Sequence, residues 1–364
     1  MNINTPLYPL STSSFLPHYM SDEIFSDTVL QGYSPSQLRN VYGFDSSMRA
    51  DGIKIAVVCA FDNVALQYNV EEFCRRFSLE VPEISVFYPQ GRAQITTDSW
   101  ITESSLDVQW ISVFAPGAQI MCVFAQNALT DSMLSAVEYA KTLRPDVICM
   151  CFGTQESAGF SQSNSIFQDE GIIFVASCGN TSALADFPST SGHVLSVGAT
   201  ELVLDDRNRR ISESVWKNTG SGISDLFDIP EYQRIFQPIQ SLTGGKRGVP
   251  DVSFCGSKEY GASIFVSQRG GWTSAGGTSL ACACVSGICA CTAKSNPYVK
   301  NEGIHEYFYS LAGKTSYNIP QYYFYDIIFG SNARYSATDG WDLCTGLGSV
   351  TSKTVRNNEA LFYS

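Results

Sequence analysis

Two acidic residues stand four positions apart in a segment with helical periodicity. The segment 102–114 predicts a helix, with Thr102 in the N-cap position. Glu103 and Asp107 fall on its apolar side, whereas its serines and Gln109 share the opposite, solvated side. Burying a carboxylate is costly unless it is paired, so two inward acids need a partner, a shared proton or a catalytic role. Their proximity raises one pKa, which suits general acid–base chemistry. A first-turn Glu and a solvated Asp remain the alternative for this segment alone.

A serine opens a second predicted helix behind a glycine-rich turn. The run 274–281 reads Ser-Ala-Gly-Gly-Thr-Ser-Leu-Ala and places Ser279 in the first helical turn. Glycines let a substrate backbone come close, and a helix N-terminus favours developing negative charge. Because a serine at a helix start is more often a cap than a nucleophile, this segment gains weight only together with the two acids.

The elements that must position these residues alternate between short apolar runs and helical segments. This order is typical of a mostly parallel α/β sheet. The expected strands span 53–60, 84–88, 120–125, 147–152, 172–176 and 194–197, and the expected helices span 70–77, 102–114, 131–143 and 279–293. Residues 1–30 are polar and aperiodic, so we expect an arm over the surface, followed by one domain over 31–364.

Several motifs, in order along the chain, resemble those of the sedolisins, the serine-carboxyl peptidases. Gly276 to Ser279 resembles the nucleophile motif that sedolisins share with subtilisins, and Glu103-x-x-x-Asp107 followed by Ala-Pro-Gly-Ala resembles the sedolisin acid helix. Further matches are Tyr-Ser-Pro-Ser-Gln-Leu-Arg at 33–39, Ser-Val-Trp at 214–216 and Pro-Asp-Val-Ser at 250–253. The resemblance spans residues 33–349. It implies a subtilisin-like three-layer α/β fold, with helices flanking a central sheet, and a serine-type peptidase that cuts peptide or protein substrates. An endopeptidase is expected, although the sequence does not separate endo- from exopeptidase action.

The resemblance also assigns roles within the site. It implies that Ser279 is the nucleophile, Glu103 the general base and acid, and Asp107 its support. The family's oxyanion residue is an aspartate, and the matching position in Ser-Cys-Gly-Asn-Thr is held by Asn180. An amide donates a hydrogen bond at any pH, and one such donor is worth about 3 to 4 kcal/mol in the transition state. The alternative is that Asn180 only favours the turn.

The region of about 320–350 resembles the sedolisin calcium site. By that match Asp326 and Asp342 would ligate one structural Ca²⁺ through carboxylates, and Ile327, Thr338 and Gly340 through backbone carbonyls. An all-oxygen set suits a hard cation. Without the match, two aspartates in glycine-containing loops would indicate turns.

Two departures from the family pattern support a rival hypothesis. Ala283 stands where the family has proline soon after the serine, and the long N-terminal propeptide of sedolisins is missing. The rival is a catalytically idle, calcium-stabilised peptide-binding protein on the same scaffold.

Two other classes of serine hydrolase do not fit the sequence. The surroundings of His18, His193 and His305 do not match a Ser-His-Asp motif. An α/β-hydrolase would need a Gly-x-Ser-x-Gly elbow followed by a histidine, and the sequence has neither.

The composition limits the possible partners and the cellular compartment of the protein. A net charge of -12 argues against nucleic acid as a partner. The 12 cysteines alternate within apolar segments, which suggests a reducing compartment and a cytoplasmic protein. Four cysteines come closest to the spacing of a zinc site, but they fall in a helix of small residues, so we interpret them as packing residues: Cys282, Cys284, Cys289 and Cys291. The segment 272–293 indicates a buried helix rather than a membrane span. The first twenty residues match no signal peptide. The sequence does not indicate an oligomeric state.

Overall fold

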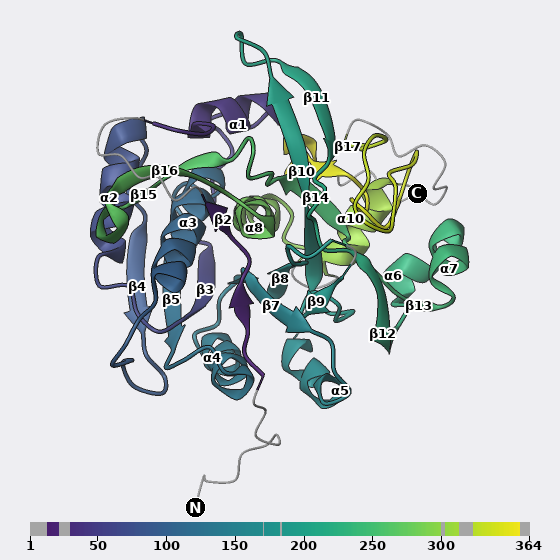
Figure 1. Cartoon of the computed structure of the whole chain (residues 1–364), viewed down its shortest axis with the longest axis horizontal. Helices are drawn as coiled ribbons and strands as arrows, with labels where there is room; N and C mark the ends of the chain where they lie inside the picture. The colour runs from purple at the N-terminus through teal and green to yellow at the C-terminus, as the bar shows by residue number, and fades with distance from the viewer. Residues whose placement is uncertain are drawn as a thin grey trace, which may run out of the picture.

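A ten-stranded sheet forms the centre of the molecule (Figure 1). The computed structural model describes residues 13–21, 30–169, 171–182, 184–299, 303–312 and 323–356. The strand order is β17-β18-β14-β10-β8-β6-β3-β5-β4, with β11 paired to β10. The bounds are β3 Lys54–Ala60, β4 Glu83–Phe87, β5 Gln119–Ala125, β6 Val147–Met150, β8 Ile173–Ser177, β10 Leu195–Leu204, β11 Arg210–Val215, β14 Val252–Cys255, β17 Phe324–Tyr325 and β18 Ser349–Val350. Among the described strand pairs of this sheet, only β10–β11 and β17–β18 are antiparallel.

The central strands are continuous apolar runs because both faces of the sheet are covered. In β3, Ile55 pairs with Ile120 on one side and Val147 on the other, and every residue of the strand after Lys54 is buried. The six expected strands all form; five match within about two residues at their ends, whereas β10 extends to Leu204, well beyond the expected end at 197. The predicted mostly parallel α/β fold with flanking helices is confirmed.

The helices α3 (Asp98–Phe114) and α8 (Thr278–Ser295) pack closely against each other. A Cβ on Gly287 of α8 would lie 2.9 Å from the Cβ of Phe114, so glycine lets the two helices approach. Among the described helices, α8 alone is long and apolar enough to cross a membrane, but 89% of it is buried inside the protein. This burial is that of a core helix, as the sequence predicted.

The structure corrects two expectations about α3. The helix begins one turn earlier than predicted, and Thr97 rather than Thr102 caps it by accepting a hydrogen bond from the Trp100 N–H. The side expected to be solvated is buried too. Gln109, for example, donates a hydrogen bond to the Phe265 carbonyl at 2.8 Å and accepts one from the Phe265 N–H at 3.0 Å. Polar residues on both sides of α3 are satisfied inside the protein, so helical periodicity alone misassigned its exposure.

The remaining elements complete the layers around the sheet. The other helices are α1 Pro35–Val41, α2 Leu66–Phe77, α4 Thr130–Thr142, α5 Phe160–Ser163, α6 Glu231–Arg234, α7 Gln237–Thr243 and α10 Ile304–Ala312, with short 3-10 turns at 164–167, 267–269 and 352–354. The strands outside the central sheet are β1 Leu16–Pro17, β2 Met20–Ser21, β7 Phe152–Gln155, β9 Asp186–Phe187, β12 Gly222–Asp228, β13 Lys246–Val249, β15 Ala262–Val266 and β16 Gly271–Gly276.

The described part of the N-terminal segment, residues 13–21, is partly exposed and partly buried. Residues 13–21 run beside β7 and past the start of α8 (Figure 1). β1 pairs antiparallel with β7, and β2 pairs antiparallel with β16. Phe15 is fully buried, and His18 is 4% exposed. The division into an arm and one domain stays a prediction, but the side chains of Phe15 and His18 are buried in the interior.

A buried ion pair fixes the loop between β13 and β14. Arg247 donates to Asp251 through both terminal nitrogens, at 2.7 and 2.6 Å, and both side chains are fully buried. Asp251 also accepts hydrogen bonds from the Tyr309 hydroxyl at 2.9 Å and the Ser196 N–H at 2.9 Å. Burial of two charges is tolerated here because their remaining hydrogen-bonding capacity is largely satisfied.

Candidate active site

Ser279 lies in the first turn of α8, directly after β16. Gly277 precedes the helix with a positive φ of 90°, a conformation that favours glycine. A Cβ there would lie 2.2 Å from the His18 carbonyl oxygen, so only glycine lets another chain segment pass this close. The Ser279 hydroxyl donates to the Cys151 carbonyl at 3.3 Å, and its backbone N–H donates to the His18 carbonyl at 3.2 Å.

Glu103 and Asp107 project from α3 toward the same place. Both are fully buried, and one oxygen of each lies within 4.8 Å of the other and of the Cys151 sulfur. Glu103 Oε2 accepts a hydrogen bond from the Tyr19 N–H at 3.0 Å, and the weak donor Cys59 lies 3.8 Å from Asp107 Oδ2. The second oxygen of each carboxyl group has no hydrogen-bond partner among the described residues.

Burial dominates the electrostatics of this pair. It raises the pKa of Glu103 well above its usual value, and the negative charge of Asp107 raises it further, while the Ser279 hydroxyl and the Tyr19 N–H lower it. Burial also raises the pKa of Asp107 well above its usual value, with a second contribution from Cys149. The interaction between the two neighbouring carboxyl groups raises the pKa of Glu103 and lowers that of Asp107. The dyad therefore titrates as one unit that retains a proton in a range where solvated carboxyl groups have lost theirs.

Asn180 follows β8 and faces the start of α8. Its Oδ1 accepts hydrogen bonds from the Thr278 N–H at 2.9 Å and the Thr278 hydroxyl at 3.0 Å. Because a backbone N–H can only donate, Oδ1 must occupy that side, and the amide nitrogen faces the other way. Nδ2 donates to the His18 carbonyl at 2.5 Å. Thr278, which sequence reasoning did not single out, thus fixes the orientation of the predicted oxyanion donor.

Three of the four predicted residues, Ser279, Glu103 and Asn180, therefore contact a single peptide unit, His18-Tyr19. Its carbonyl oxygen accepts from Asn180 Nδ2 and from the Ser279 N–H. Its N–H donates to Glu103 Oε2. Two donors at the oxygen and one carboxyl group at the nitrogen are the groups that peptide-bond cleavage requires. Nothing in the sequence pointed to this unit, because His18 and Ser279 are 261 positions apart.

The His18 side chain is buried beside the site, next to Ser177 and Asp186. Its Nδ1 lies 2.8 Å from the Ser177 hydroxyl, and its Nε2 lies 3.1 Å from Asp186 Oδ2. These three residue types also occur in Ser-His-Asp hydrolases. Here, however, the carbonyl that accepts from Asn180 Nδ2 and the Ser279 N–H belongs to His18 itself. The His18 ring is thus held as the side chain of the residue whose backbone lies in the site.

The C-terminal loops bring the two predicted calcium aspartates together. Asp326 Oδ2 accepts from the Gly340 N–H at 2.9 Å, and Asp342 Oδ2 accepts from the Thr338 N–H at 3.1 Å. Asp326 Oδ1 is buried without a hydrogen-bond partner among the described residues. Burial raises the pKa of Asp342 to about 7, with a further contribution from the charge of Asp326, and burial also raises the pKa of Asp326. Two neighbouring buried carboxyl groups with an unused oxygen fit a hard cation.

The fold and the serine–carboxyl geometry define a subtilisin-like domain, and comparisons with known proteins agree. Residues 99–326 match the subtilase family (Peptidase_S8). The chain is 29% identical to kumamolisin of Bacillus sp. (strain MN-32) over 358 residues, which cover 87% of this chain and 62% of that protein. It is 29% identical to sedolisin of Pseudomonas sp. (strain 101) over 221 residues, which cover 55% of this chain and 35% of that protein. The chain therefore spans less than two thirds of the length of either relative.

Solved structures support the fold. Pseudomonas sedolisin, a serine-carboxyl proteinase solved with two molecules of pseudo-iodotyrostatin, superimposes with a TM-score of 0.79 at 22% identity, covering 92% of this chain and 98% of that one. Fervidolysin of Fervidobacterium pennivorans, related to subtilisin, superimposes with a TM-score of 0.56 at 16% identity, covering 87% of this chain and 45% of that one. The chain belongs to the subtilase family and, through these relatives, to its sedolisin group, as the motifs predicted.

Proposed function

We propose that the protein is a serine-carboxyl peptidase in which Ser279 attacks the peptide carbonyl. Glu103, in its ionised form, takes the Ser279 hydroxyl proton and then delivers it to the leaving amine. Asp107 shares a proton with Glu103 and tunes its basicity. The observation that carries the proposal is the His18-Tyr19 peptide unit, whose oxygen faces two donors and whose nitrogen faces Glu103.

The oxyanion of the tetrahedral intermediate would bind to Asn180 Nδ2 and the Ser279 N–H. Both groups converge on one carbonyl oxygen already in the ground state. They lie at the N-terminus of an 18-residue helix, which favours negative charge. Because these donors are fixed before the reaction, they need no reorganisation as charge develops.

We also propose one structural Ca²⁺ between the loops at 326–342. Asp326 and Asp342 would hold it through carboxylates, and Ile327, Thr338 and Gly340 through carbonyls. The unpaired Asp326 oxygen and the raised pKa of both aspartates support this assignment. The cation would neutralise two buried carboxylates and tie the C-terminal loops to β18. A cytoplasmic location remains part of this proposal, on the strength of the cysteine content.

The test is a digest of a peptide library with mass-spectrometric detection, which compares wild type with Ser279→Ala, Glu103→Gln and Asp107→Asn. Ser279→Ala and Glu103→Gln should each abolish cleavage while the melting temperature stays near that of wild type, since nucleophile and base act as one unit. Asp107→Asn should be severely impaired. Ser177→Ala is the matched control, because among the described residues its hydroxyl contacts the His18 ring and none of the proposed catalytic side chains.

Two results would contradict the assignment. Cleavage retained in clean Ser279→Ala but lost in Ser177→Ala would move the nucleophile to the other serine. A wild type that binds peptides without cutting any of them would favour the idle peptide-binding protein.

A further inference from the structure

We propose that Cys149, Cys151 and Cys282 bind one Cu⁺ ion through their sulfur atoms, in a site behind the proposed catalytic residues. The metal binding goes beyond the proposed peptidase function and does not depend on it. The expected effect of the ion on peptide cleavage rests on that function.

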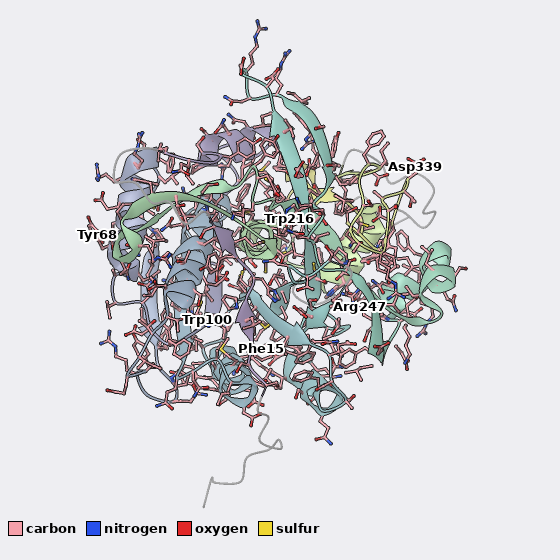
Figure 2. All side chains as sticks on the ribbon, viewed as in Figure 1. Phe15, Tyr68, Trp100, Trp216, Arg247 and Asp339 are labelled. Atoms are coloured by element: carbon pink, nitrogen blue, oxygen red, sulfur yellow. The ribbon has the colours of Figure 1, made fainter. Side chains whose placement is uncertain are left out.

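The three thiols come from two segments that pack against each other in the centre of the molecule. Cys149 belongs to β6, where it pairs with Val57 on one side and Val175 on the other. Cys151 follows two positions later, and Cys282 lies in α8, which packs on β6. The helix α8 lies in the middle of the molecule among packed side chains (Figure 2), and the three cysteines are buried. The sequence predicts Cys282 as a packing residue of its helix, but the structure places it beside two further thiols.

The sulfur atoms are spaced like the ligands of one metal ion. Sγ of Cys149 lies 3.5 Å from that of Cys151 and 4.0 Å from that of Cys282. All three sulfurs lie within 4.8 Å of one another. With metal–sulfur bonds of about 2.3 Å, the sulfurs of a three- or four-ligand site are about 3.8 to 4.0 Å apart. An ion between them would therefore need only small side-chain shifts to contact all three.

The number and type of the ligands select the ion. Thiolates bind soft ions, and Cu⁺ and Zn²⁺ are those that proteins bind as single ions through cysteine. Zn²⁺ in a structural site takes four ligands, and an iron–sulfur cluster takes four cysteines. Within the described ranges, no histidine, aspartate, glutamate or further cysteine joins the three sulfurs as a fourth ligand within 4.8 Å. Three sulfurs without a fourth ligand favour Cu⁺.

A buried hydroxyl group faces the same cluster. Ser286 lies one turn after Cys282 on α8, is fully buried, and neighbours the sulfurs of Cys149 and Cys282. Its Oγ has no hydrogen-bond partner among the residues that the structure describes. A buried hydroxyl without a partner is costly. Because a metal-bound thiolate is a strong acceptor, the Ser286 hydroxyl would donate to it and stabilise the occupied site.

Cys151 connects this three-thiol site to the proposed catalytic residues. Its sulfur also lies within 4.8 Å of one oxygen of Glu103 and one of Asp107, and its carbonyl oxygen accepts from the Ser279 hydroxyl at 3.3 Å. A metal-bound Cys151 would have lost its thiol proton and would carry negative charge beside both acids. This charge would repel the negative charge that Glu103 carries when it takes the Ser279 proton. We therefore expect the bound ion to slow peptide cleavage.

Binding involves no change in oxidation state. Cu⁺ replaces the protons of the thiols that bind it as thiolates, the protons pass to water, and the copper remains Cu⁺. Because the three side chains are buried, the ion must enter while the chain folds or opens locally. Copper must therefore be present during expression of the protein.

The first experiment measures copper in the full-length chain, expressed with and without added copper and purified without oxygen. A Cu⁺-specific chelator removes weakly bound copper before the metal is counted by mass spectrometry. We expect one copper per chain, and X-ray absorption should show three sulfur ligands at about 2.3 Å. Loss of the copper to the chelator, or coordination by two sulfurs or by nitrogen and oxygen, would overturn the site. A preference for Zn²⁺ from a medium that contains both ions would show that the ion is wrong.

The second experiment assigns the ligands with Cys149→Ala, Cys151→Ala and Cys282→Ala. Chelator competition should show that each of them lowers the Cu⁺ affinity by more than about a hundredfold, and Ser286→Ala by about tenfold. Cys284→Ala is the matched control, since Cys284 is equally buried in α8 but belongs to no group of three potential ligands among the described side chains. An equal loss of affinity in this control would mean that copper binds a cysteine-rich chain without a defined site. Melting temperatures of the copper-free variants identify any that do not fold, and the X-ray absorption of wild type does not depend on them.

The third experiment compares kcat/KM for a fluorogenic peptide with and without bound copper. Copper should lower it at least about tenfold in wild type and in Cys284→Ala, and should have no effect in Cys149→Ala. An unchanged rate in copper-loaded wild type would contradict the effect on cleavage, whereas the site itself would stand. If wild type cuts no peptide in either form, the proposed function is wrong, and the first two experiments still decide whether the three thiols bind copper.

Discussion

Replacing Asn180 by aspartate tests the oxyanion site most directly. In the wild type, Nδ2 donates to the carbonyl oxygen at 2.5 Å. An aspartate can donate there only while it is protonated. Once ionised it would keep both hydrogen bonds from Thr278 and sit at the N-terminus of α8, so the structure favours the ionised form. The donor is therefore lost as pH rises.

One oxyanion donor is worth about 10² to 10³ in kcat. We expect Asn180→Asp to approach wild-type activity in acid and to fall to about 10⁻² to 10⁻³ of it at alkaline pH, which moves the alkaline limb toward acid. The acid limb should stay in place. The acid limb reports the titration of the Glu103 and Asp107 dyad. Because the pKa values of both groups are raised, this limb should lie at higher pH than for an ordinary carboxyl group, and the wild-type optimum should lie closer to neutral pH.

The assay is kcat/KM for a fluorogenic peptide across the pH range, with melting temperatures recorded alongside. Asn180→Ala is the control: it lacks a donor at every pH, so its profile should drop by about 10² to 10³ without moving. Two findings would refute the reasoning. One is an unmoved alkaline limb in Asn180→Asp, and the other is a loss of less than about tenfold in Asn180→Ala, which would leave Asn180 as a turn residue.

Three further predictions concern stability. Asp251→Ala should lower the free energy of unfolding by about 3 to 5 kcal/mol in urea titrations, because it leaves Arg247 buried without its partner; a loss below about 1 kcal/mol would show that the pair is dispensable. Gly287→Ala should cost about 1 to 3 kcal/mol in the same titration, since its Cβ would lie 2.9 Å from that of a facing phenylalanine, and an unchanged midpoint would mean that α3 and α8 separate freely. Ca²⁺ at a hundredfold excess over Kd should add about 2.7 kcal/mol, and chelation should lower the melting temperature. Asp326→Ala and Asp342→Ala should abolish that response, and an undiminished response in both would contradict the metal assignment.

Local patterns in the sequence predicted the core strands of the central sheet and the residues that we propose as reacting groups. Apolar runs such as 53–60 predict buried parallel strands, because side chains covered on both faces must all be apolar. The four-residue spacing of Glu103 and Asp107 put both on one helix face, and the glycines before Ser279 indicated a close approach of backbone to a helix start. The resemblance to sedolisins then ordered these pieces into one site.

Only the tertiary structure decided which groups face the proposed catalytic residues. Periodicity reports that one side of α3 differs from the other, but not that both sides are buried, because that depends on Asn69, Phe265 and other residues distant in the chain. The orientation of Asn180 depends on Thr278, 98 positions away. The entry of His18 into the site depends on strand pairing with β7, which the sequence of a short, aperiodic segment does not indicate. Contacts of this kind are set by the packing of distant segments, and a local sequence pattern carries no record of them.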